Sequence, residues 1–247
     1  MIPKVIHYCW FGHNPLPKLA RRCIESWKKF LPDYEIKEWN EENFDVSIIP
    51  YTKDAYECKK YAFVSDYARF WILYHYGGVY FDTDVEVIKP MDEIINNGAF
   101  MGSEIVASDD TELRVAAGLG LACESHNSLY KDILNYYKDL SFLVDGVPNL
   151  TTVVKIVTDL LYSKGLKSVN EIQEIEGIKI YPAEYFAART NSIVNIPLTE
   201  NSYSVHHYMA SWESPYFKFK KKLSKVLGGK IMSHLVAIKR GFIKLFK

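Results

Sequence analysis

The sequence lacks the features that mark membrane-spanning, disulfide-rich and low-complexity proteins. No apolar run approaches the roughly 20 residues that a spanning helix requires. The four cysteines lie far apart and none forms a CxxC pair, which argues against a zinc site. With no secretory signal at the N-terminus, the same spacing predicts reduced thiols in a cytosolic protein. Apolar residues make up 48% of the 247 positions, enough for a sizeable core without disulfides.

Acidic residues are missing from the C-terminal segment. Residues 214–247 hold ten Lys and Arg but no Asp or Glu, whereas residues 1–213 hold twenty bases against thirty acids. Apolar residues recur there every three or four positions, which predicts an amphipathic helical tail with a basic face. We therefore predict a globular domain over 1–213 and a separate tail over 214–247. The tail either packs on the domain or lies on an anionic membrane surface.

The order of predicted elements indicates an α/β fold. A strand at 4–10, an amphipathic helix at 18–32 and a strand at 34–40 predict a βαβ unit with parallel strands. Residues 52–76 are predicted to be helical, and 77–88 are predicted to form one strand that runs through Asp82 and Asp84. Ligands of such sheets bind at the carboxyl ends of the strands. Later segments predict strands near 99–104, 118–124, 178–188 and 203–212, and helices at 128–140 and 150–165.

The helix between Ala62 and Tyr76 carries polar residues among apolar ones. It is apolar on almost every side, which predicts a buried helix. Ser65, Asp66 and Arg69 form one stripe on it. Buried charges are costly unless they are paired or used for binding. Two interpretations follow: an Asp66–Arg69 ion pair within the helix, or a site where Asp66 accepts a ligand hydroxyl and Arg69 faces an anion.

Two carboxylates follow the glycine pair after this helix. Asp82 and Asp84 can converge on one hard cation, and oxygen ligands suit Mg²⁺ or Mn²⁺. Carboxylates at the end of an apolar strand would repel each other without a cation, so the pattern favours a metal site over a solvated loop. A third ligand is expected from His206, with His207 as the alternative, because adjacent strand residues point to opposite faces.

Trp10 lies at the end of the first predicted strand. A tryptophan at this position is either a core residue or a flat stacking surface for a nucleobase at the ligand-binding edge of the sheet.

These segments together resemble a known enzyme family. "IPKVIHYCWFG", "AFVSDYARFWILYHYGGVYFDTDVEV", "IYPAEYF" and "HHYMASW" resemble the DXD-containing nucleotide-sugar glycosyltransferases of family 32, which include bacterial capsular and exopolysaccharide sugar transferases. The resemblance covers most of residues 1–213. It implies a GT-A fold, which is a Rossmann-like mixed sheet flanked by helices. It also implies a transferase that depends on Mn²⁺ or Mg²⁺ and retains the anomeric configuration.

The resemblance also implies roles, partners and a location. The donor is a nucleotide-sugar, with UDP-sugars favoured, and the acceptor is a glycan or lipid-linked glycan in polysaccharide biosynthesis. No nucleic-acid partner is expected. The expected location is the cytoplasm, with the tail as a candidate for attachment to the inner face of the membrane. The implied residues are Trp10 for base stacking, Asp66 and Arg69 for the donor sugar and diphosphate, Tyr80 beside the nucleotide, Asp82 and Asp84 as the DXD pair, and Trp212 as a cap over the donor.

Two other classes remain open from the sequence. "VYFDTDV" also satisfies the signature of haloacid-dehalogenase phosphatases, in which Asp82 would be the nucleophile and Asp84 the acid. That class needs a later acidic pair for its metal, and it usually carries the signature on its first strand, whereas about 80 residues precede the pair here. The third interpretation is a non-catalytic sugar-binding module. The intact set of Asp66, Arg69, Asp82 and Asp84 argues against it.

Overall fold

The computed structural model describes residues 1–108, 111–189 and 196–209, and Met1–Met209 forms one compact unit. The predicted boundary at residue 213, Trp212 and the basic tail all lie outside the described residues, so the prediction of two parts stays a prediction. Among the described residues, no helix has the length and apolar character needed to cross a bilayer.

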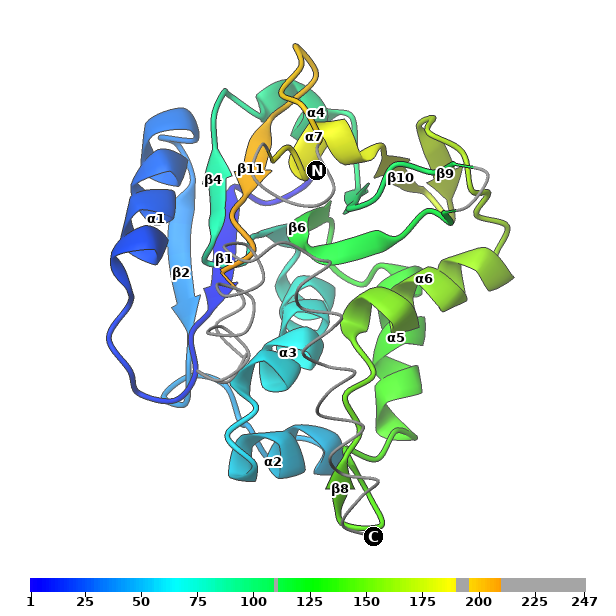
Figure 1. Ribbon diagram of the computed structural model, residues 1–247. Coiled ribbons are helices and arrows are strands. Elements are labelled where there is room, and N and C mark those ends of the chain that lie inside the picture. Colours follow the sequence, from blue (N-terminus) through cyan, green and yellow to red (C-terminus); the bar gives the residue numbers. More distant parts are fainter. Residues whose placement is uncertain (109–110, 190–195, 210–247) are drawn as a thin grey trace, which may run out of the picture. The chain divides into compact units, whose positions relative to one another are not determined.

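A seven-stranded mixed sheet lies at the centre of this unit (Figure 1). Its strands are β1 (Val5–Cys9), β2 (Glu35–Trp39), β3 (Gly78–Tyr80), β5 (Phe100–Ser103), β6 (Val115–Cys123), β9 (Gln173–Ile175) and β10 (Ile178–Tyr181). Two small sheets pair β4 (Val85–Val87) with β11 (Ser204–His206), and β7 (Leu143–Val144) with β8 (Val147–Pro148). The helices are α1 (Lys18–Phe30), α2 (Pro50–Glu57), α3 (Tyr61–Tyr76), α4 (Asp92–Asn96), α5 (Ser128–Lys138), α6 (Val153–Ser163) and α7 (Ala183–Phe186).

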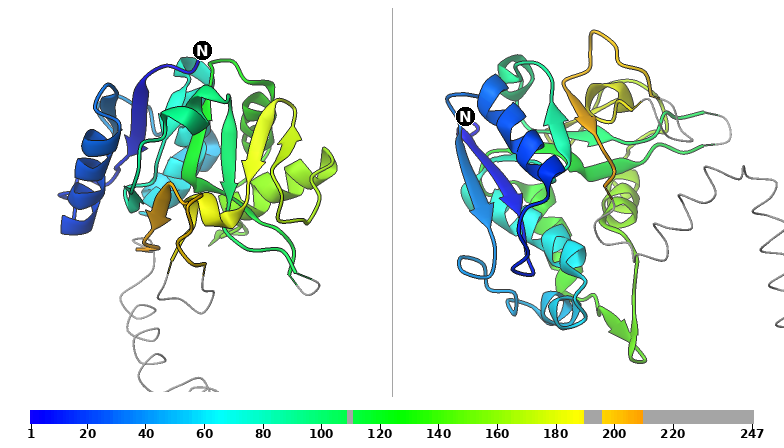
Figure 2. Two further views of the ribbon diagram at one scale, coloured as in Figure 1. Left: turned by 90° about the horizontal axis from the view of Figure 1, so that it is seen from above. Right: turned by 60° about the vertical axis from the view of Figure 1, so that its left-hand side comes forward.

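The strand directions place several strand ends at one edge of the sheet. The order is β2-β1-β3-β6-β5-β10-β9, and β1 is parallel to both β2 and β3. Strand β6 is antiparallel to its neighbours β3 and β5, and β10 is parallel to β5. The carboxyl ends of β1, β3, β5 and β10 therefore share an edge of the sheet, which runs from β2 to β9 (Figure 2 shows the blue N-terminal strands at one end). This architecture confirms the predicted α/β class, a Rossmann-like mixed sheet flanked by helices, and the GT-A type stays a prediction.

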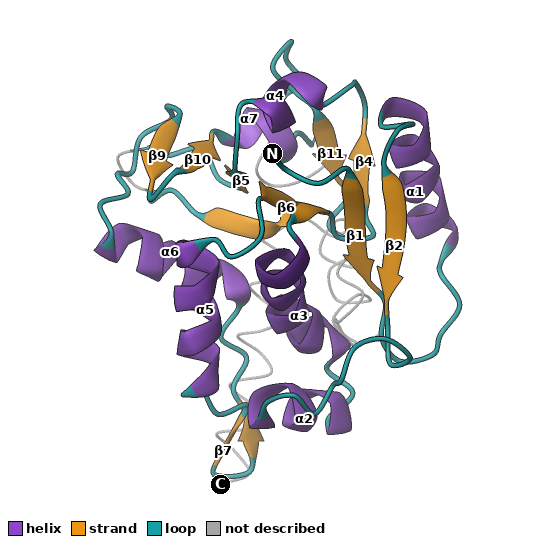
Figure 3. Cartoon of the chain, turned by 180° about the vertical axis from the view of Figure 1, so that it is seen from behind, coloured by secondary structure: helices purple, strands orange, loops and turns teal. Residues whose placement is uncertain are grey.

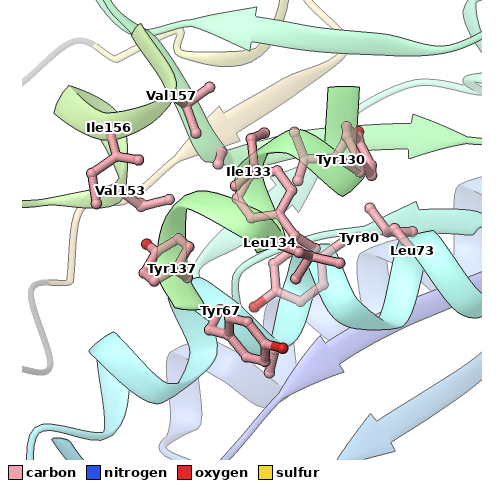
Figure 4. Close-up of a cluster of buried hydrophobic side chains, with 14 of the residues drawn as sticks. Tyr67, Leu73, Tyr80, Tyr130, Ile133, Leu134, Tyr137, Val153, Ile156 and Val157 are labelled. Atoms are coloured by element: carbon pink, nitrogen blue, oxygen red, sulfur yellow. The ribbon is translucent and has the colours of Figure 1, made fainter. Parts of the chain in front are cut away.

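Two hydrophobic cores cover the two faces of the sheet. Successive side chains of a strand alternate between the faces, so Tyr8 belongs to one core and Cys9 to the other. The larger core packs α2, α3, α5 and α6 together on one side (Figure 3). Figure 4 shows Tyr67 of α3, Tyr137 of α5 and Val153 of α6 converging in it. The second core packs α1, β4, α4 and α7 against the other face. Helix α3 is thereby buried, as the sequence predicts.

The predicted helix at 52–76 is two helices. Helix α2 ends at Glu57 and α3 begins at Tyr61. Between them Lys59 adopts a left-handed backbone with φ of 56°, and the Lys60 N–H donates to the Ala55 carbonyl at 2.8 Å. This turn satisfies the last carbonyls of α2. Residues 51–76 contain no glycine or proline, so the sequence lacks the usual sign of a break.

The predicted strand at 77–88 is also divided. Strand β3 ends at Tyr80 in the large sheet, and β4 begins at Val85 and pairs with β11 instead. The Val85 N–H donates to the Asp82 carbonyl at 3.0 Å, so the two aspartates lie in a tight turn between two sheets. In a strand the two carboxylates would share a face because side chains alternate, and in the turn their ligand atoms also lie within 4.8 Å of each other.

Candidate functional site

The turn at Asp82–Asp84 forms the centre of a polar cluster. Ligand atoms of Asp82, Asp84 and His206 all lie within 4.8 Å of one another. The first two come from the carboxyl end of β3, and the third comes from β11, which pairs with β4 directly after the turn. The structure thus brings together three side chains that the sequence predicts as a metal site.

Asp84 is held by the C-terminal part of the described chain. Its Oδ1 lies 3.1 Å from His206 Nε2, and its Oδ2 accepts from the Met209 N–H at 2.6 Å. Burial alone raises the pKa of a carboxyl group, but these contacts outweigh it and hold the pKa of Asp84 below its ordinary value. Asp84 is therefore an anion at neutral pH and can bind a cation.

The two histidines point to different sides. His206 faces Asp84, whereas His207 Nε2 lies 2.7 Å from Glu86 Oε2. Adjacent residues at the end of a strand alternate in this way. Of the two candidates that the sequence leaves open for the third ligand, the structure places His206 beside the aspartates. The Nδ1 atom of His206 is buried and has no hydrogen-bond partner in the described part of the chain.

Arg69 links helix α3 to the turn. Its Nη2 lies 2.8 Å from Asp66 Oδ1 and 3.2 Å from Asp82 Oδ1, and all but 4% of its side chain is buried. Burial disfavours the guanidinium ion, but the neighbouring acidic groups, Asp82 first among them, outweigh it and raise the pKa of Arg69. The intrahelical ion pair that one interpretation predicts is present, and the same Arg69 also reaches the carboxylate pair.

Asp66 is buried beside this arginine. Burial raises the pKa of Asp66 to about 7, although Arg69 and a hydrogen bond from the Val153 N–H act in the opposite direction. Asp66 can therefore exchange a proton near neutral pH. A carboxyl group with such a pKa can accept from a sugar hydroxyl or donate to it.

Tyr80 lies behind the site and is completely buried. Its hydroxyl donates to Asp82 Oδ1 at 3.1 Å, and the guanidinium carbon of Arg69 lies 5.1 Å from the centre of its ring. In this structure Tyr80 orients Asp82. The predicted place of Tyr80 beside a nucleotide stays a prediction.

Trp10 lies where the sequence places it, directly after β1. The side chain is half-buried, and its indole N–H donates to the Asn14 carbonyl at 2.6 Å. Because β1 is parallel to β3, Trp10 follows the neighbouring strand at the same edge as Asp82. Base stacking by Trp10 and the capping role of Trp212, which is outside the described residues, both stay predictions.

Gly118 of β6 is a site residue that the sequence did not reveal. A Cβ atom at this position would lie 1.9 Å from Asp82 Oδ2, and the Gly118 carbonyl accepts from the Asp82 N–H at 3.0 Å. In the ladder between β5 and β6, Met101 pairs with Leu121 but Gly102 pairs with Ala116, so residues 117–120 bulge. The two glycines of "AGLGL" inside an apolar strand were the available signal.

Glu104 is a second residue that the sequence did not reveal. It directly follows β5, whose carboxyl end shares an edge with that of β3. Burial raises the pKa of Glu104, and the nearby His206, Arg189 and Arg114 lower it by less. An acid directly after the apolar strand "AFMGS" was the signal, and it is the same signal that identified Asp82.

The residues of this cluster fit a divalent cation. Two carboxylates and one imidazole within 4.8 Å offer the oxygen and nitrogen ligands that Mn²⁺ accepts, and the carboxylates also suit Mg²⁺. The missing Cβ of Gly118 leaves room for the Asp82 carboxylate to face the other ligands. A divalent cation held by these residues could neutralise the charge of a bound anion such as a diphosphate.

Comparison with known families bears on what kind of site this is. Residues 17–101 match the family described as glycosyltransferase sugar-binding region containing DXD motif, and this range includes Asp66, Arg69, Asp82 and Asp84. The match covers about a third of the chain, and the predicted carboxylates, arginine and glycine pair all lie within it. This similarity supports a transferase over the phosphatase that "VYFDTDV" also allowed.

Individual relatives of this chain are distant. Inositol phosphoceramide mannosyltransferase 1 of Schizosaccharomyces pombe is 32% identical over 111 residues, which are 40% of this chain and 33% of the relative. The chain thus spans about a third of the length of that relative. An uncharacterised glycosyltransferase of Acanthamoeba polyphaga mimivirus is 24% identical over 234 residues, 90% of this chain and 87% of the relative. A solved glycosyltransferase involved in glycosylation of the major capsid of PBCV-1 aligns with a TM-score of 0.49 and 11% identity over 85% of this chain and 95% of that one.

Proposed function

We propose that this glycosyltransferase moves a hexose from a nucleoside diphosphate sugar to an acceptor hydroxyl in a metal-dependent reaction that retains the anomeric configuration. The observation that carries the proposal is the convergence of Asp82, Asp84 and His206 within 4.8 Å, with Asp82 also bound to the buried Arg69. A diphosphate leaving group is stabilised by positive charge. Acidic side chains that hold a cation, together with a neighbouring guanidinium, would supply that charge.

Each residue has a part in the proposed reaction. A divalent cation bound by Asp82, Asp84 and His206 would neutralise the charge that develops on the diphosphate as the sugar bond breaks. Arg69 adds a fixed positive charge, and Tyr80 and Gly118 keep the Asp82 carboxylate in place. Asp66, with its pKa near 7, would hold a hydroxyl of the donor sugar. We assign no covalent nucleophile, so retention requires the acceptor oxygen to attack the sugar from the face that the diphosphate leaves. The bond from the sugar to the diphosphate breaks as the new bond forms, and the acceptor proton passes to the departing diphosphate.

The donor and acceptor are proposed from two kinds of similarity. The sequence motifs favour a UDP-sugar and an acceptor that is a glycan or lipid-linked glycan of polysaccharide biosynthesis. The names of the yeast relatives support a second candidate reaction, which is mannose transfer to an inositol-containing sphingolipid. The expected donor of that reaction is GDP-mannose.

A binding panel distinguishes these donors. We would measure the thermal unfolding midpoint with UDP-glucose, UDP-galactose, UDP-N-acetylglucosamine and GDP-mannose, each with and without Mn²⁺. A ligand at a hundredfold excess over its Kd stabilises the protein by about 2.7 kcal/mol, which is readily seen. The true donor should also be hydrolysed slowly with Mn²⁺. Hydrolysis of simple phosphomonoesters instead would indicate the phosphatase, and donor binding without turnover would indicate a sugar-binding module.

We also propose that the basic tail attaches the enzyme to the inner face of the cytoplasmic membrane. Ten unopposed Lys and Arg between 214 and 247 support this, at about 1 kcal/mol for each basic residue near an anionic leaflet. Such a location would serve a lipid-linked acceptor. A chain truncated after Pro215 should still hydrolyse the donor but should no longer sediment with anionic liposomes at low salt. Equal sedimentation of both chains would contradict the membrane role, and unfolding of the truncated chain would show that the tail belongs to the core.

A further inference from the structure

An ion-pair chain lies next to the metal cluster without being part of it. Glu86 Oε2 accepts from Arg22 Nη2 at 2.6 Å and lies 2.7 Å from His207 Nε2. Arg22 belongs to α1, Glu86 belongs to β4, and His207 directly follows β11. The carboxylate of Glu86 therefore connects three segments of the chain. Glu86 and His207 are both partly buried, with side-chain exposures of 22% and 27%.

Helix α1 and strand β11 hold β4 from its two sides. On one side, the Trp27 indole N–H donates to the Val85 carbonyl at 2.8 Å, and the Val87 N–H donates to Ser26 Oγ at 3.0 Å. On the other side, β11 forms an antiparallel ladder in which Val205 pairs with Glu86 and His206 pairs with Val85 (Figure 1). Side chains of α1 thus occupy the edge where another strand would pair, and Arg22 belongs to the same helix.

The register of β11 decides which histidine reaches Asp84. The His207 N–H donates to the Asp84 carbonyl at 3.0 Å, while the His207 ring turns to Glu86 and the His206 ring turns to Asp84. A slip of one residue in such a ladder would exchange the two rings, because the side chains alternate. Backbone hydrogen bonds extend the ladder at both ends, from the Ile88 N–H to the Tyr203 carbonyl and from the His207 N–H to the Asp84 carbonyl. The contact between His207 and Glu86 adds a side-chain contact that a slip of the register would break.

We propose that Glu86, held by Arg22, is a positioning residue that fixes the register of β11 and so keeps His206 among the metal ligands. This inference rests on the proposed metal site and adds residues that touch neither metal nor donor. Removal of partners that orient metal ligands typically lowers metal affinity 10- to 100-fold.

The test is Mn²⁺ binding by the metal-free full-length chain, followed by the paramagnetic resonance signal of free Mn²⁺. Glu86→Ala should weaken Mn²⁺ binding about tenfold or more. His207→Ala should have a similar effect, and His207→Gln should restore much of the affinity because its amide can still donate to Glu86. Arg22→Met, which removes an exposed side chain, should give a smaller loss and should fold even where Glu86→Ala does not. Glu176→Gln is the matched control. Glu176 lies on the turn between β9 and β10, and its carboxylate accepts from Lys164 Nζ at 2.7 Å, as Glu86 accepts from Arg22.

The outcomes separate this inference from the proposed function. A purely structural role of Glu86 would lower the unfolding midpoint and leave the Mn²⁺ affinity of the folded variant unchanged, which would overturn the inference while the metal site stands. An equal loss in His207→Gln and His207→Ala would also overturn it. If the wild-type chain bound no Mn²⁺, both the metal site and the positioning role would be wrong.

Discussion

The carboxylate of Asp82 occupies the space beside Gly118 in which any other residue would place its Cβ atom. The built Cβ lies 1.9 Å from Asp82 Oδ2 and 2.8 Å from Asp82 Cγ. No real Cβ contact is so short, so Asp82 can keep this position only opposite a glycine. The geometry of the site therefore depends on a residue of the antiparallel strand β6 as well as on the DXD turn itself.

Gly118→Ala should consequently impair the site more than the fold. The added methyl group displaces Asp82, so we expect Mn²⁺ affinity to fall at least about tenfold. Crowding should lower stability by about 1–3 kcal/mol. Calorimetric titration with Mn²⁺ measures the first effect and urea unfolding the second. Gly98→Ala is the control, because nothing lies within 4 Å of its Cβ and its φ of 104° should cost stability alone. Unchanged Mn²⁺ affinity in Gly118→Ala would contradict the role of Gly118.

Asp84→Asn should abolish metal-dependent sugar transfer while the chain stays folded. The amide oxygen can still accept from the Met209 N–H, but the negative charge that faces His206 is lost. Since partners of metal ligands already change metal affinity 10- to 100-fold, loss of a direct ligand should reduce activity by about a hundredfold or more. Donor hydrolysis with saturating Mn²⁺ is the measurement, with circular dichroism as the control for folding. Normal turnover would show that Asp84 does not bind the metal.

Arg69→Lys should be poorly tolerated although the charge is kept. Arg69 Nη2 reaches Asp66 and Asp82 at 2.8 and 3.2 Å while its Nε–H donates to the Ser65 carbonyl at 3.1 Å. Lysine has a single nitrogen and no planar fork, so it cannot make all three contacts. We expect donor affinity in Mn²⁺ to fall by about tenfold. Arg69→Met should destabilise the fold by about 3–5 kcal/mol, because it leaves buried carboxylates unpaired. Near-normal donor affinity in Arg69→Lys would reduce Arg69 to a structural ion pair.

Trp10→Ala should weaken binding of the whole nucleotide. Stacking of a base on an aromatic ring contributes about 1–3 kcal/mol by alanine substitution. Free UDP and a UDP-sugar should therefore lose affinity equally, since they share the base. The measurement is calorimetric titration of both ligands in Mn²⁺. If Trp10 only packs against the domain, the variant should unfold at a lower temperature and bind both ligands normally.

The acid stability of the metal-free chain should depend on two buried groups with opposite effects. His7 accepts from the Trp39 indole at Nδ1 and donates from Nε2 to the Gly77 carbonyl, and burial lowers the pKa of His7 from 6.5 to about 4. The contribution of His7 to the free energy of unfolding is fully present above pH 6.5. As the pH falls towards 4 this contribution is lost, and the total loss is about 3 kcal/mol. Asp66, raised from 3.8 to about 7, contributes stability that is present at low pH and is lost as the pH rises through 7.

Single variants should separate the two contributions. Between pH 4.5 and 6 each group changes the free energy of unfolding by about 1.4 kcal/mol per pH unit, with opposite signs. Relative to the wild-type chain, Asp66→Asn should therefore lose stability more steeply on acidification, and His7→Gln should lose it less steeply. Urea unfolding in the presence of a chelator measures both slopes. Parallel pH profiles for all three chains would show that neither pKa is shifted.

The sequence was sufficient for the class of fold and for most of the candidate site. The βαβ start, the buried helix with Asp66 and Arg69, and the carboxylate pair each have a local pattern, because burial and charge conflict at those positions. Gly118 has no such local conflict, and its place in the site arises from strand pairing between distant segments. Glu104 follows an apolar strand as Asp82 does, but only the pairing of β5 with β6 brings that strand beside the site. The break at Lys59 and the turn at Asp82 were missed for a related reason. Both are set by hydrogen bonds and packing around the segment rather than by a glycine or proline within it.

The site joins two segments that are far apart in the chain. His206 and Met209 lie 122 and 125 positions after the Asp84 that they contact. Every strand of the seven-stranded sheet ends before residue 182, so during synthesis, when N-terminal parts fold first, the sheet can form well before its third candidate ligand exists. A nascent chain that stops short of β11 would therefore have the fold but an incomplete cation site. On the proposed metal site, competence to bind a cation would be acquired only after β11 has been made.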